Sequence, residues 1–297
     1  MKDNTDSSWS EEPIENKMER AQTIPVNSPI EDAIKRLQDS KSHCLCVVHE
    51  SGELAGLFTE DDVVNKVLDR DLNGDEPVVD FIDREPYSLQ VTSNVKQVID
   101  LMGERVLYYL PLCDKDMKPK GIFSIRELIH TLSDKTELKG ARYVWSDPNV
   151  DLGAFQQAII EVLNLPVSFA ISRYGYDQTV PIGKKDSVQK ALDKLKGTQQ
   201  RAALVYDEGD LAGLFRVRDV PFRLYHKNAD MANMPVGELM TSLPKQVSED
   251  ECLAGAFNQM SQNRLLFLHH KTLEGRFLLI PAAGLLAYLY AHIHDDI

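Results

Sequence analysis

The stretch 56–62 reads GLFTEDD, and residues 121–127 read GIFSIRE, with glycine, an apolar residue and phenylalanine in the same order. GLFRVRD follows at 213–219 and GRFLLIP at 275–281. The four glycines are separated by 65, 92 and 62 positions, so one motif occurs four times at unequal intervals. Such self-similarity indicates a repeat architecture and decides how the rest of the sequence is divided.

The segments upstream of each glycine have the apolar spacing of an amphipathic helix. Apolar residues recur at i, i+3, i+4 and i+7, which places them on one helix face. From the first of these residues to the glycine there are 26, 26, 25 and 22 positions. Agreement in phase and nearly in length indicates four units of one kind. The four helices are expected at 28–37, 93–102, 186–195 and 251–260.

Each helix is followed by an apolar run, a turn and the strand that carries the glycine, which predicts a β-hairpin. A second helix follows the hairpin, and a short strand precedes the first helix. The unit is therefore β-α-β-β-α, about 60 residues long. The apolar runs are 44–48, 107–112, 202–206 and 265–269, and the second helices are expected at 60–68, 125–132, 217–225 and 281–290.

A unit of this size cannot bury both faces of its sheet alone, so neighbouring units should pair. The longest interval separates the second glycine from the third, which predicts two pairs with an insert between them. The insert contains a helical pattern, AFQQAIIEVL, at 154–163. The expected boundaries are a flexible acidic arm at 1–20, a first pair at 21–135 (units 21–74 and 78–135), the insert at 136–176, and a second pair at 177–297 (units 177–228 and 235–292).

This pattern resembles the cystathionine-beta-synthase (CBS) domain family. The helix phase, LPL at 110–112 in place of the family's Leu-Pro-Val, and the element Gly-apolar-x-Ser/Thr-x-x-Asp carry the resemblance. It implies an α/β (α+β) fold with four CBS repeats in two tandem pairs, called Bateman modules.

The resemblance also implies a ligand, an adenosine nucleotide such as AMP, ADP or ATP. In the family a carboxylate holds the ribose hydroxyls, and a Ser or Thr three residues earlier lies near the phosphate. Backbone groups of the first two strands hold the adenine. The ligand-binding residues implied in this chain are Thr59, Asp62 and Ile24 in repeat 1, Ser124, Glu127 and Leu89 in repeat 2, and Asp219, Arg216, Arg218 and Ile182 in repeat 3.

The repeats differ in how well they match this element. Glu127 is one methylene longer than the family's Asp, which puts the ribose contact in repeat 2 in doubt. Arg216 replaces the hydroxyl in repeat 3, where it could contact a phosphate directly with help from Arg218. Repeat 4 has Leu278 and Pro281 at the two positions, so we expect it to be structural.

A structural alternative applies to every one of these residues. Thr59 and Asp62 stand at the start of a helix, where such side chains cap the backbone whatever else they do. Arg105 precedes a strand where relatives can place a phosphate contact, but surface solvation explains it as well. His269 and His270 are interpreted as a solvated pair and not as metal ligands.

Composition limits the remaining function classes. The net charge of −13 argues against nucleic-acid and anionic-membrane partners. Cys44, Cys46, Cys113 and Cys252 have no metal-type spacing, and Cys44 and Cys46, which lie in an apolar run, are expected in the core. The polar start excludes a secretory signal and the apolar C-terminal stretch is too short to span a bilayer, so a cytoplasmic location is expected.

The first hypothesis is a non-catalytic sensor that needs no cofactor and reports nucleotide occupancy. Its output would go to a regulated enzyme or transporter, or through a homodimer of CBS pairs. A scaffold protein with decayed ligand sites is the alternative. An enzyme is disfavoured because no nucleophile, base or metal motif is found.

Overall fold

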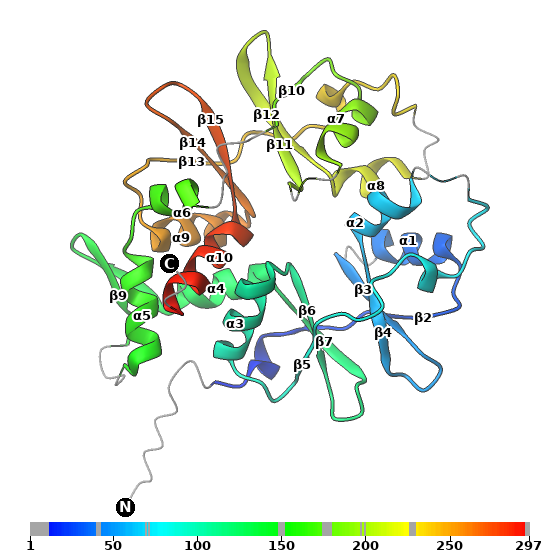
Figure 1. Ribbon diagram of the computed structural model, residues 1–297, viewed down its shortest axis with the longest axis horizontal. Coiled ribbons are helices and arrows are strands. Elements are labelled where there is room, and N and C mark those ends of the chain that lie inside the picture. Colours follow the sequence, from blue (N-terminus) through cyan, green and yellow to red (C-terminus); the bar gives the residue numbers. More distant parts are fainter. Residues whose placement is uncertain are drawn as a thin grey trace, which may run out of the picture.

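Four copies of one β-α-β-β-α unit make up most of this computed structural model (Figure 1). The structure describes residues 12–39, 43–68, 70, 72–147, 152–173, 180–196, 198, 200–225 and 230–294. Every helix and strand predicted for the four units is present, within a few residues of the expected bounds.

The first two units have the following elements. Repeat 1 contains β2 (Thr23–Pro25), α1 (Ile30–Asp39), β3 (Cys44–Val48), β4 (Leu54–Thr59), α2 (Glu60–Asp62) and the π-helical turn η3 (Val63–Val67). Repeat 2 contains β5 (Leu89–Gln90), α3 (Val95–Arg105), β6 (Tyr109–Cys113), β7 (Pro119–Ser124) and α4 (Ile125–Asp134).

The other two units follow the same order. Repeat 3 contains β10 (Ile182–Gly183), α7 (Val188–Leu195), β11 (Ala202–Asp207), β12 (Asp210–Arg216) and α8 (Asp219–Leu224). Repeat 4 contains β13 (Gln246–Val247), α9 (Leu253–Asn263), β14 (Phe267–Lys271), β15 (Phe277–Pro281) and α10 (Ala282–Ile293).

The strand register corrects the alignment of repeat 4. In each unit the first residue of the second strand pairs with the last of the third, in the pairs Cys44–Thr59, Tyr109–Ser124, Ala202–Arg216 and Phe267–Pro281. Pro281 therefore stands at the hydroxyl position and Gly284 at the carboxylate position, three residues later than expected. Gly275 matches the motif in sequence, but it belongs to the turn before the strand and has a φ of 84°. Repeat 4 still carries neither polar group.

The other three glycines lie within strands where another segment crosses closely. A Cβ on Gly213 would come 2.6 Å from the carbonyl oxygen of Thr241, and one on Gly121 would come 2.9 Å from that of Glu19. A Cβ on Gly56 would collide with the carbonyl oxygen of Asp83. The motif's glycine is therefore needed for backbone approach in three repeats.

The four repeats form a ring in which each unit packs chiefly against two others (Figure 1). Helices α3 and α4 of repeat 2 pack on α10 and α9 of repeat 4, and Gly103 lets α3 approach Tyr290 closely. Helix α8 of repeat 3 contacts α1 and η3 of repeat 1, and Gln38 Nε2 donates to Pro221 O at 2.6 Å.

Sheets make the other two contacts of the ring. Cys44 and Cys46 of repeat 1 share a buried cluster with Ile122 of repeat 2, and β11 of repeat 3 contacts β15 of repeat 4. The order around the ring is thus repeat 1, repeat 2, repeat 4, repeat 3. Sheets join the repeats that were expected to pair, and helices join the two halves. The division into two modules with the stated boundaries stays a prediction.

The segments outside the repeats complete the core of repeats 2 and 4. The predicted insert helix is α5 (Ala154–Leu163), and a hairpin of β8 (Thr136–Lys139) and β9 (Arg142–Trp145) and a helix α6 (Val167–Arg173) were not foreseen. The expectation of a flexible arm is wrong for residues 12–20. There Ile14 is fully buried and β1 (Glu19–Arg20) extends the sheet of repeat 2. Residues 1–11 lie outside the described residues.

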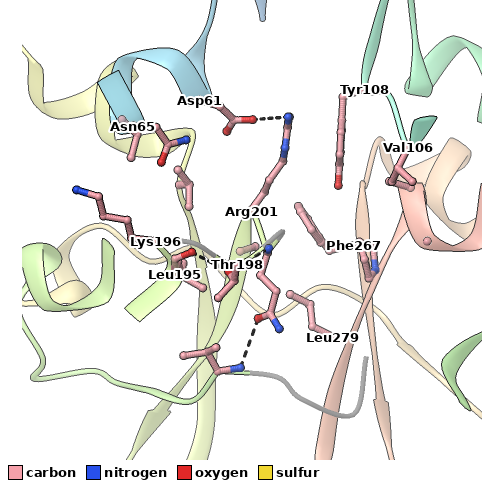
Figure 2. A pocket seen from close by; sticks show the side chains of 18 of the residues that line it. Asp61, Asn65, Val106, Tyr108, Leu195, Lys196, Thr198, Arg201, Phe267 and Leu279 are labelled. Carbon is pink, nitrogen blue, oxygen red and sulfur yellow. Dashed lines mark hydrogen bonds and ion pairs between the residues drawn. The ribbon is translucent and has the colours of Figure 1, made fainter. Parts of the chain in front are cut away.

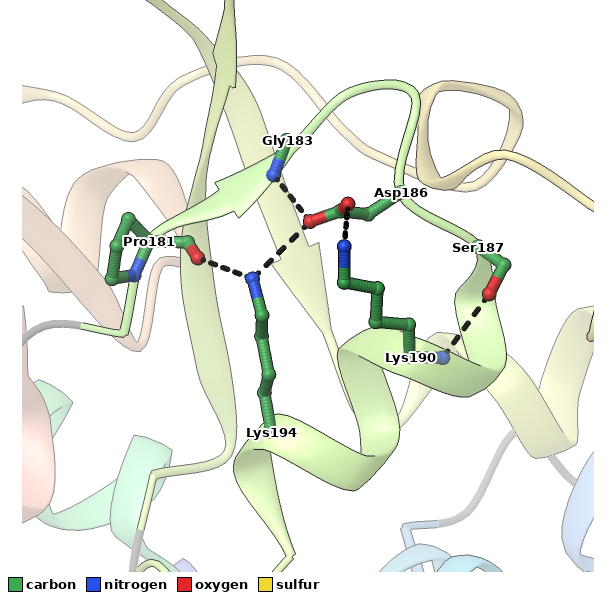
Figure 3. A network of polar contacts seen from close by, with 6 residues as sticks. All are labelled: Pro181, Gly183, Asp186, Ser187, Lys190 and Lys194. Carbon is green, nitrogen blue, oxygen red and sulfur yellow. Dashed lines mark hydrogen bonds and ion pairs between the residues drawn. The ribbon is translucent and has the colours of Figure 1, made fainter.

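A polar network fixes the first strand of repeat 3 to its first helix (Figure 3). The Asp186 carboxylate accepts hydrogen bonds from Gly183 N at 3.0 Å and from Lys190 Nζ at 2.6 Å. Lys194 Nζ donates to the same carboxylate at 3.2 Å and to Pro181 O at 3.1 Å. These bonds lower the pKa of Asp186 to about 2, the Lys190 bond most strongly.

The two adjacent histidines are buried, so the expectation that they are solvated is wrong. The Nδ1 atoms of His269 and His270 lie 2.9 Å from Pro244 O and 3.1 Å from Val247 O, both within hydrogen-bond distance. These bonds connect β14 to the chain of β13. Among the described residues no cluster of His, Cys, Asp and Glu could hold a metal ion, and no helix is long and apolar enough to cross a bilayer.

Candidate functional site

A cavity of about 630 Å³ lies between the four repeats and receives side chains from each of them (Figure 2). Repeat 1 contributes residues of α2 and η3, and repeat 3 contributes the end of α7 and the start of β11. Tyr108 comes from repeat 2, and Phe267 and Leu279 come from repeat 4. The volume is within the range of sites for small organic ligands.

One part of the wall is apolar. Leu192 and Leu195 of α7 face the cavity together with Val217, Phe267 and Leu279. The helix is amphipathic, so the leucines that fill the core of repeat 3 also reach the cavity at its end. Such a wall suits a flat, largely apolar group.

Arg201 dominates the polar part of the wall. Its guanidinium forms an ion pair with Asp61 and lies 3.9 Å from the ring centroid of Tyr108 (Figure 2). Burial alone would lower the pKa of Arg201, but Asp61 and Tyr108 outweigh it and raise that pKa. Arg201 is therefore a fixed cation held in place from two other repeats.

More cationic than anionic side chains line the cavity. Arg105, Lys196 and Arg201 line it, whereas Asp61 is the one carboxylate among its described lining residues. Arg105 is half-exposed at the rim, where it pairs with Glu104 at 2.8 Å. Arg201, the most buried of the three, is paired with Asp61.

The four repeats place different residues at one shared position, directly before the second strand. These residues are His43, Tyr108, Arg201 and Leu266. Tyr108 and Arg201 line the cavity, and neither was among the predicted site residues. Extending the alignment of the repeats to this position would have found them, because it varies in charge between strands that are otherwise uniformly apolar.

A buried acid lies beside the cavity-lining Asp61. Glu60 is 3 % exposed, and Tyr109 Oη donates to its Oε1 at 2.9 Å, while Oε2 has no partner among the described residues. Burial, followed by the charge of Asp61, raises the pKa of Glu60 to about 7.

The predicted pair in repeat 1 forms a capping box. Asp62 Oδ2 accepts hydrogen bonds from Thr59 N and Thr59 Oγ1, both at 2.8 Å, and Thr59 Oγ1 accepts from Asp62 N at 3.4 Å. Asp62 Oδ1 pairs with Lys66 at 2.7 Å. Both carboxylate oxygens are thus engaged within the helix, as the capping alternative requires.

The corresponding pairs in the next two repeats differ from each other. Ser124 caps α4 by accepting from Glu127 N at 3.4 Å. In repeat 3 the Asp219 carboxylate accepts two hydrogen bonds from Arg216, both at 2.8 Å. Arg216 is therefore neutralised by the residue that was expected to hold ribose, which leaves Arg218 as the better candidate for an anion.

None of the ten predicted ligand-binding residues, all of them described, lines the cavity in Figure 2. Ile24 and Ile182 are core residues with 3 % and 0 % exposure, and Leu89 is half-buried against the core of repeats 2 and 4. Val180, two residues before Ile182, does reach the cavity. Glu127 lines a second cavity of about 670 Å³, bounded by the N-terminal segment, α4 and the end of β9. The ten assignments remain predictions.

Comparison with known proteins identifies the class. The CBS domain model matches residues 15–69 and 78–134. CBS domain-containing protein CBSCBSPB1 of Arabidopsis thaliana is 20% identical over 274 residues, covering 87% of this chain and 50% of that protein. An uncharacterized 17.7 kDa protein of Acidianus ambivalens is 27% identical over 111 residues, covering 37% of this chain and 66% of that protein. The chain spans about half the length of the Arabidopsis relatives.

Solved structures extend the likeness to the whole ring. Protein MJ1225 of Methanocaldococcus jannaschii, described as a candidate archaeal homologue of γ-AMPK, has a TM-score of 0.73 at 15% identity, covering 93% of this chain and 99% of that one. An uncharacterized conserved protein of Pyrococcus horikoshii has a TM-score of 0.57 at 18% identity, with the same coverage. Residues 15–69 and 78–134 thus match the CBS domain, and the chain as a whole has the fold of these solved structures.

Proposed function

We propose that this CBS domain protein is a non-catalytic regulatory protein that binds an adenosine-type nucleotide in the cavity between the four repeats. Occupancy would be passed to a partner protein or expressed through self-assembly. The observation that carries the proposal is the pairing of an apolar wall with a fixed cation, Arg201, inside one cavity of about 630 Å³.

The two parts of the cavity match the two parts of a nucleotide. A purine ring fits against Leu192, Leu195 and Phe267, and phosphate oxygens would accept hydrogen bonds from Arg201. Because Arg201 also pairs with Asp61, a bound phosphate would compete with a contact between repeats 1 and 3. Ligand binding could thereby change how two repeats sit against each other.

Isothermal titration calorimetry on the full chain tests this proposal with AMP, ADP and ATP. Arg201→Gln should weaken AMP binding at least about tenfold, because a charge-assisted hydrogen bond is lost. Arg276→Gln is the matched control, since that arginine is exposed on the β14–β15 turn and pairs with Glu274 at 2.9 Å. Absence of binding by all three nucleotides, or equal binding by both variants, would refute the cavity assignment.

A second candidate function, a scaffold with decayed ligand sites, is favoured by one specific observation. The carboxylates of Asp62 and Asp219 are engaged by Thr59 and Lys66 and by Arg216, respectively. A protein that binds no nucleotide at all and yet retains a stable ring would fit this alternative.

A further inference from the structure

The hairpin of β8 and β9 lies outside the four repeats, and one edge of its sheet is open. Strand β8 pairs with β9 alone, and no third strand joins them among the described residues. The hairpin protrudes from the outside of the ring beside α5, at the left of the view (Figure 1). A sheet of two strands is marginally stable in water, so a further strand would stabilise this one.

Asn164, which follows α5, closes the outer edge of β9. Its Oδ1 accepts a hydrogen bond from Tyr143 N, and its Nδ2 donates to Tyr143 O, both at 2.8 Å. One side-chain amide thus satisfies the two backbone groups that a neighbouring strand would otherwise bind. A partner strand is therefore excluded from β9 at this position.

The outer edge of β8 is open at Leu138, the residue directly opposite Tyr143. In an antiparallel pair, two opposed residues direct their backbone groups either toward each other or both away. Tyr143 directs its N–H and C=O to Asn164, so Leu138 directs its own groups away from β9. Neither group of Leu138 has a hydrogen-bond partner within the described part of the chain, and its side chain is 58% exposed. A donor, an acceptor and an apolar side chain are thus available together on one exposed edge.

The charges on either side of Leu138 make β8 complementary to a second copy of itself. Glu137 and Lys139 lie on the opposite face of the strand from Leu138, where they pair with each other at 2.6 Å. Charged side chains on an edge strand normally oppose pairing with other strands. In an antiparallel copy centred on Leu138, each Glu137 instead lies directly opposite Lys139 of the partner subunit. Opposed side chains of opposite charge stabilise a strand pair, and like charges destabilise it.

We propose that β8 is a dimerisation strand, which pairs antiparallel with β8 of a second copy of this chain about a twofold axis at Leu138. Leu138 N of each copy donates to Leu138 O of the other, and the two hairpins become one sheet in the order β9, β8, β8, β9. The interface is isologous, the commonest arrangement of homodimers. Because the paired surface is small, the dimer is weak and forms at high protein concentration. It uses no residue of the cavity in Figure 2, so it does not depend on nucleotide binding.

Sedimentation equilibrium of the full chain at concentrations up to about 1 mM tests the proposal, since this range covers weak association. The wild type should dimerise. Glu137→Lys and Lys139→Glu each place like charges opposite each other, and each should weaken the dimer about tenfold. Exchanging the two charges in one chain, by both substitutions together, should restore it. Glu274→Lys is the control, because that side chain is exposed on the β14–β15 turn and its substitution should change nothing.

A mixture of the two single variants separates pairing between chains from the ion pair within one chain. In Glu137→Lys both charged positions of β8 are positive, and in Lys139→Glu both are negative. Mixed in equal amounts, the two proteins should form a heterodimer more tightly than either forms a homodimer. A wild type that stays monomeric throughout the range, single variants that dimerise as the wild type does, or a mixture that does not associate would each overturn the proposal.

Amide hydrogen exchange locates the interface within the dimer. The Leu138 amide should exchange more slowly at high protein concentration, because dimerisation gives it an acceptor. The Tyr143 amide should not change, since Asn164 already accepts from it in the single chain. Unchanged exchange at Leu138 under conditions where the dimer forms would place the interface elsewhere and overturn the proposal. Arg201→Gln should dimerise as the wild type does, so a failure of the nucleotide proposal leaves this result intact.

Discussion

The guanidinium of Arg201 lies 3.9 Å from the ring centroid of Tyr108, and the two residues occupy the same position in repeats 3 and 2. Each directly precedes the second strand of its unit. The ring brings these two equivalent positions together across the cavity, so a cation in one repeat is supported by an aromatic face from another.

This contact predicts different outcomes for two substitutions of Tyr108. Tyr108→Phe keeps the ring under the guanidinium and should change neither stability nor AMP affinity appreciably. Tyr108→Ala removes the face and part of the cavity wall, and should lower the free energy of unfolding by about 1–3 kcal/mol. Chemical denaturation and calorimetry on both variants check this. Equal losses in the two variants would show that the hydroxyl, and not the ring, is what matters.

The second prediction concerns Asp62. Because it closes a capping box with Thr59 and pairs with Lys66, Asp62→Ala should reduce stability by about 1 kcal/mol. If Asp62 also holds ribose, AMP affinity falls at least about tenfold in the same variant. Melting temperature and dissociation constant are measured together, and Lys66→Ala is the control because it removes the ion pair alone. A large loss of affinity without loss of stability would contradict the capping role.

Much of the fold could be predicted because the spacing of apolar residues within each segment indicates a helix or a strand. The helix at 154–163 was placed correctly from apolar spacing alone, as was the strand at 44–48. The hairpin at 136–145 was not predicted because its two strands have only four residues each and carry no apolar alternation.

The site was harder to predict, for a physical reason. Arg201, Asp61 and Tyr108 come from three repeats that only the closed ring brings together, and no local spacing encodes that meeting. The alignment of repeat 4 was wrong because a glycine in a turn cannot be distinguished by sequence from a glycine within a strand. The turn requires glycine at 275 because φ is positive there. Glycine is required at 213 because the backbone of Thr241 leaves no room for a Cβ atom.

The third prediction tests that lack of space. Gly213→Ala places a Cβ 2.6 Å from the backbone oxygen of Thr241, which cannot rotate away, and should cost about 1–3 kcal/mol of stability. Gly153→Ala is the comparison, because its Cβ would lie near a single side-chain atom, Gln156 Oε1 at 3.2 Å, and near no backbone oxygen. Denaturant midpoints of the two variants decide this. If they match, the crossing segment is not held against β12.

The fourth prediction concerns pH. The pKa of Glu60 is raised from 4.5 to about 7, so the folded state keeps its proton where the unfolded state has lost it. The stabilisation that protonated Glu60 contributes is therefore complete below about pH 4.5 and is lost as the pH rises to about 7. At pH 8, Glu60→Gln should exceed the wild type by on the order of 1–3 kcal/mol.

Unfolding free energies at pH 5 and pH 8 measure this difference. Glu137→Gln is the control, since that side chain pairs with Lys139 on an exposed hairpin and its substitution should leave the pH dependence intact. A wild-type profile that rises between pH 5 and pH 8 would show that Glu60 is ionised in the folded state.

The closed order of the ring has a consequence for how its sites can diverge. Two separate copies of a two-unit chain could also close such a ring, but symmetry would then force each pair of equivalent sites to carry identical residues. Joining all four units in one polypeptide removes that constraint. Thr59 with Asp62, Ser124 with Glu127, Arg216 with Asp219, and Pro281 with Gly284 can then change one at a time. In a single chain, one repeat can thus keep its pair for a ligand, another can use it for an internal ion pair, and a third can use it for packing alone.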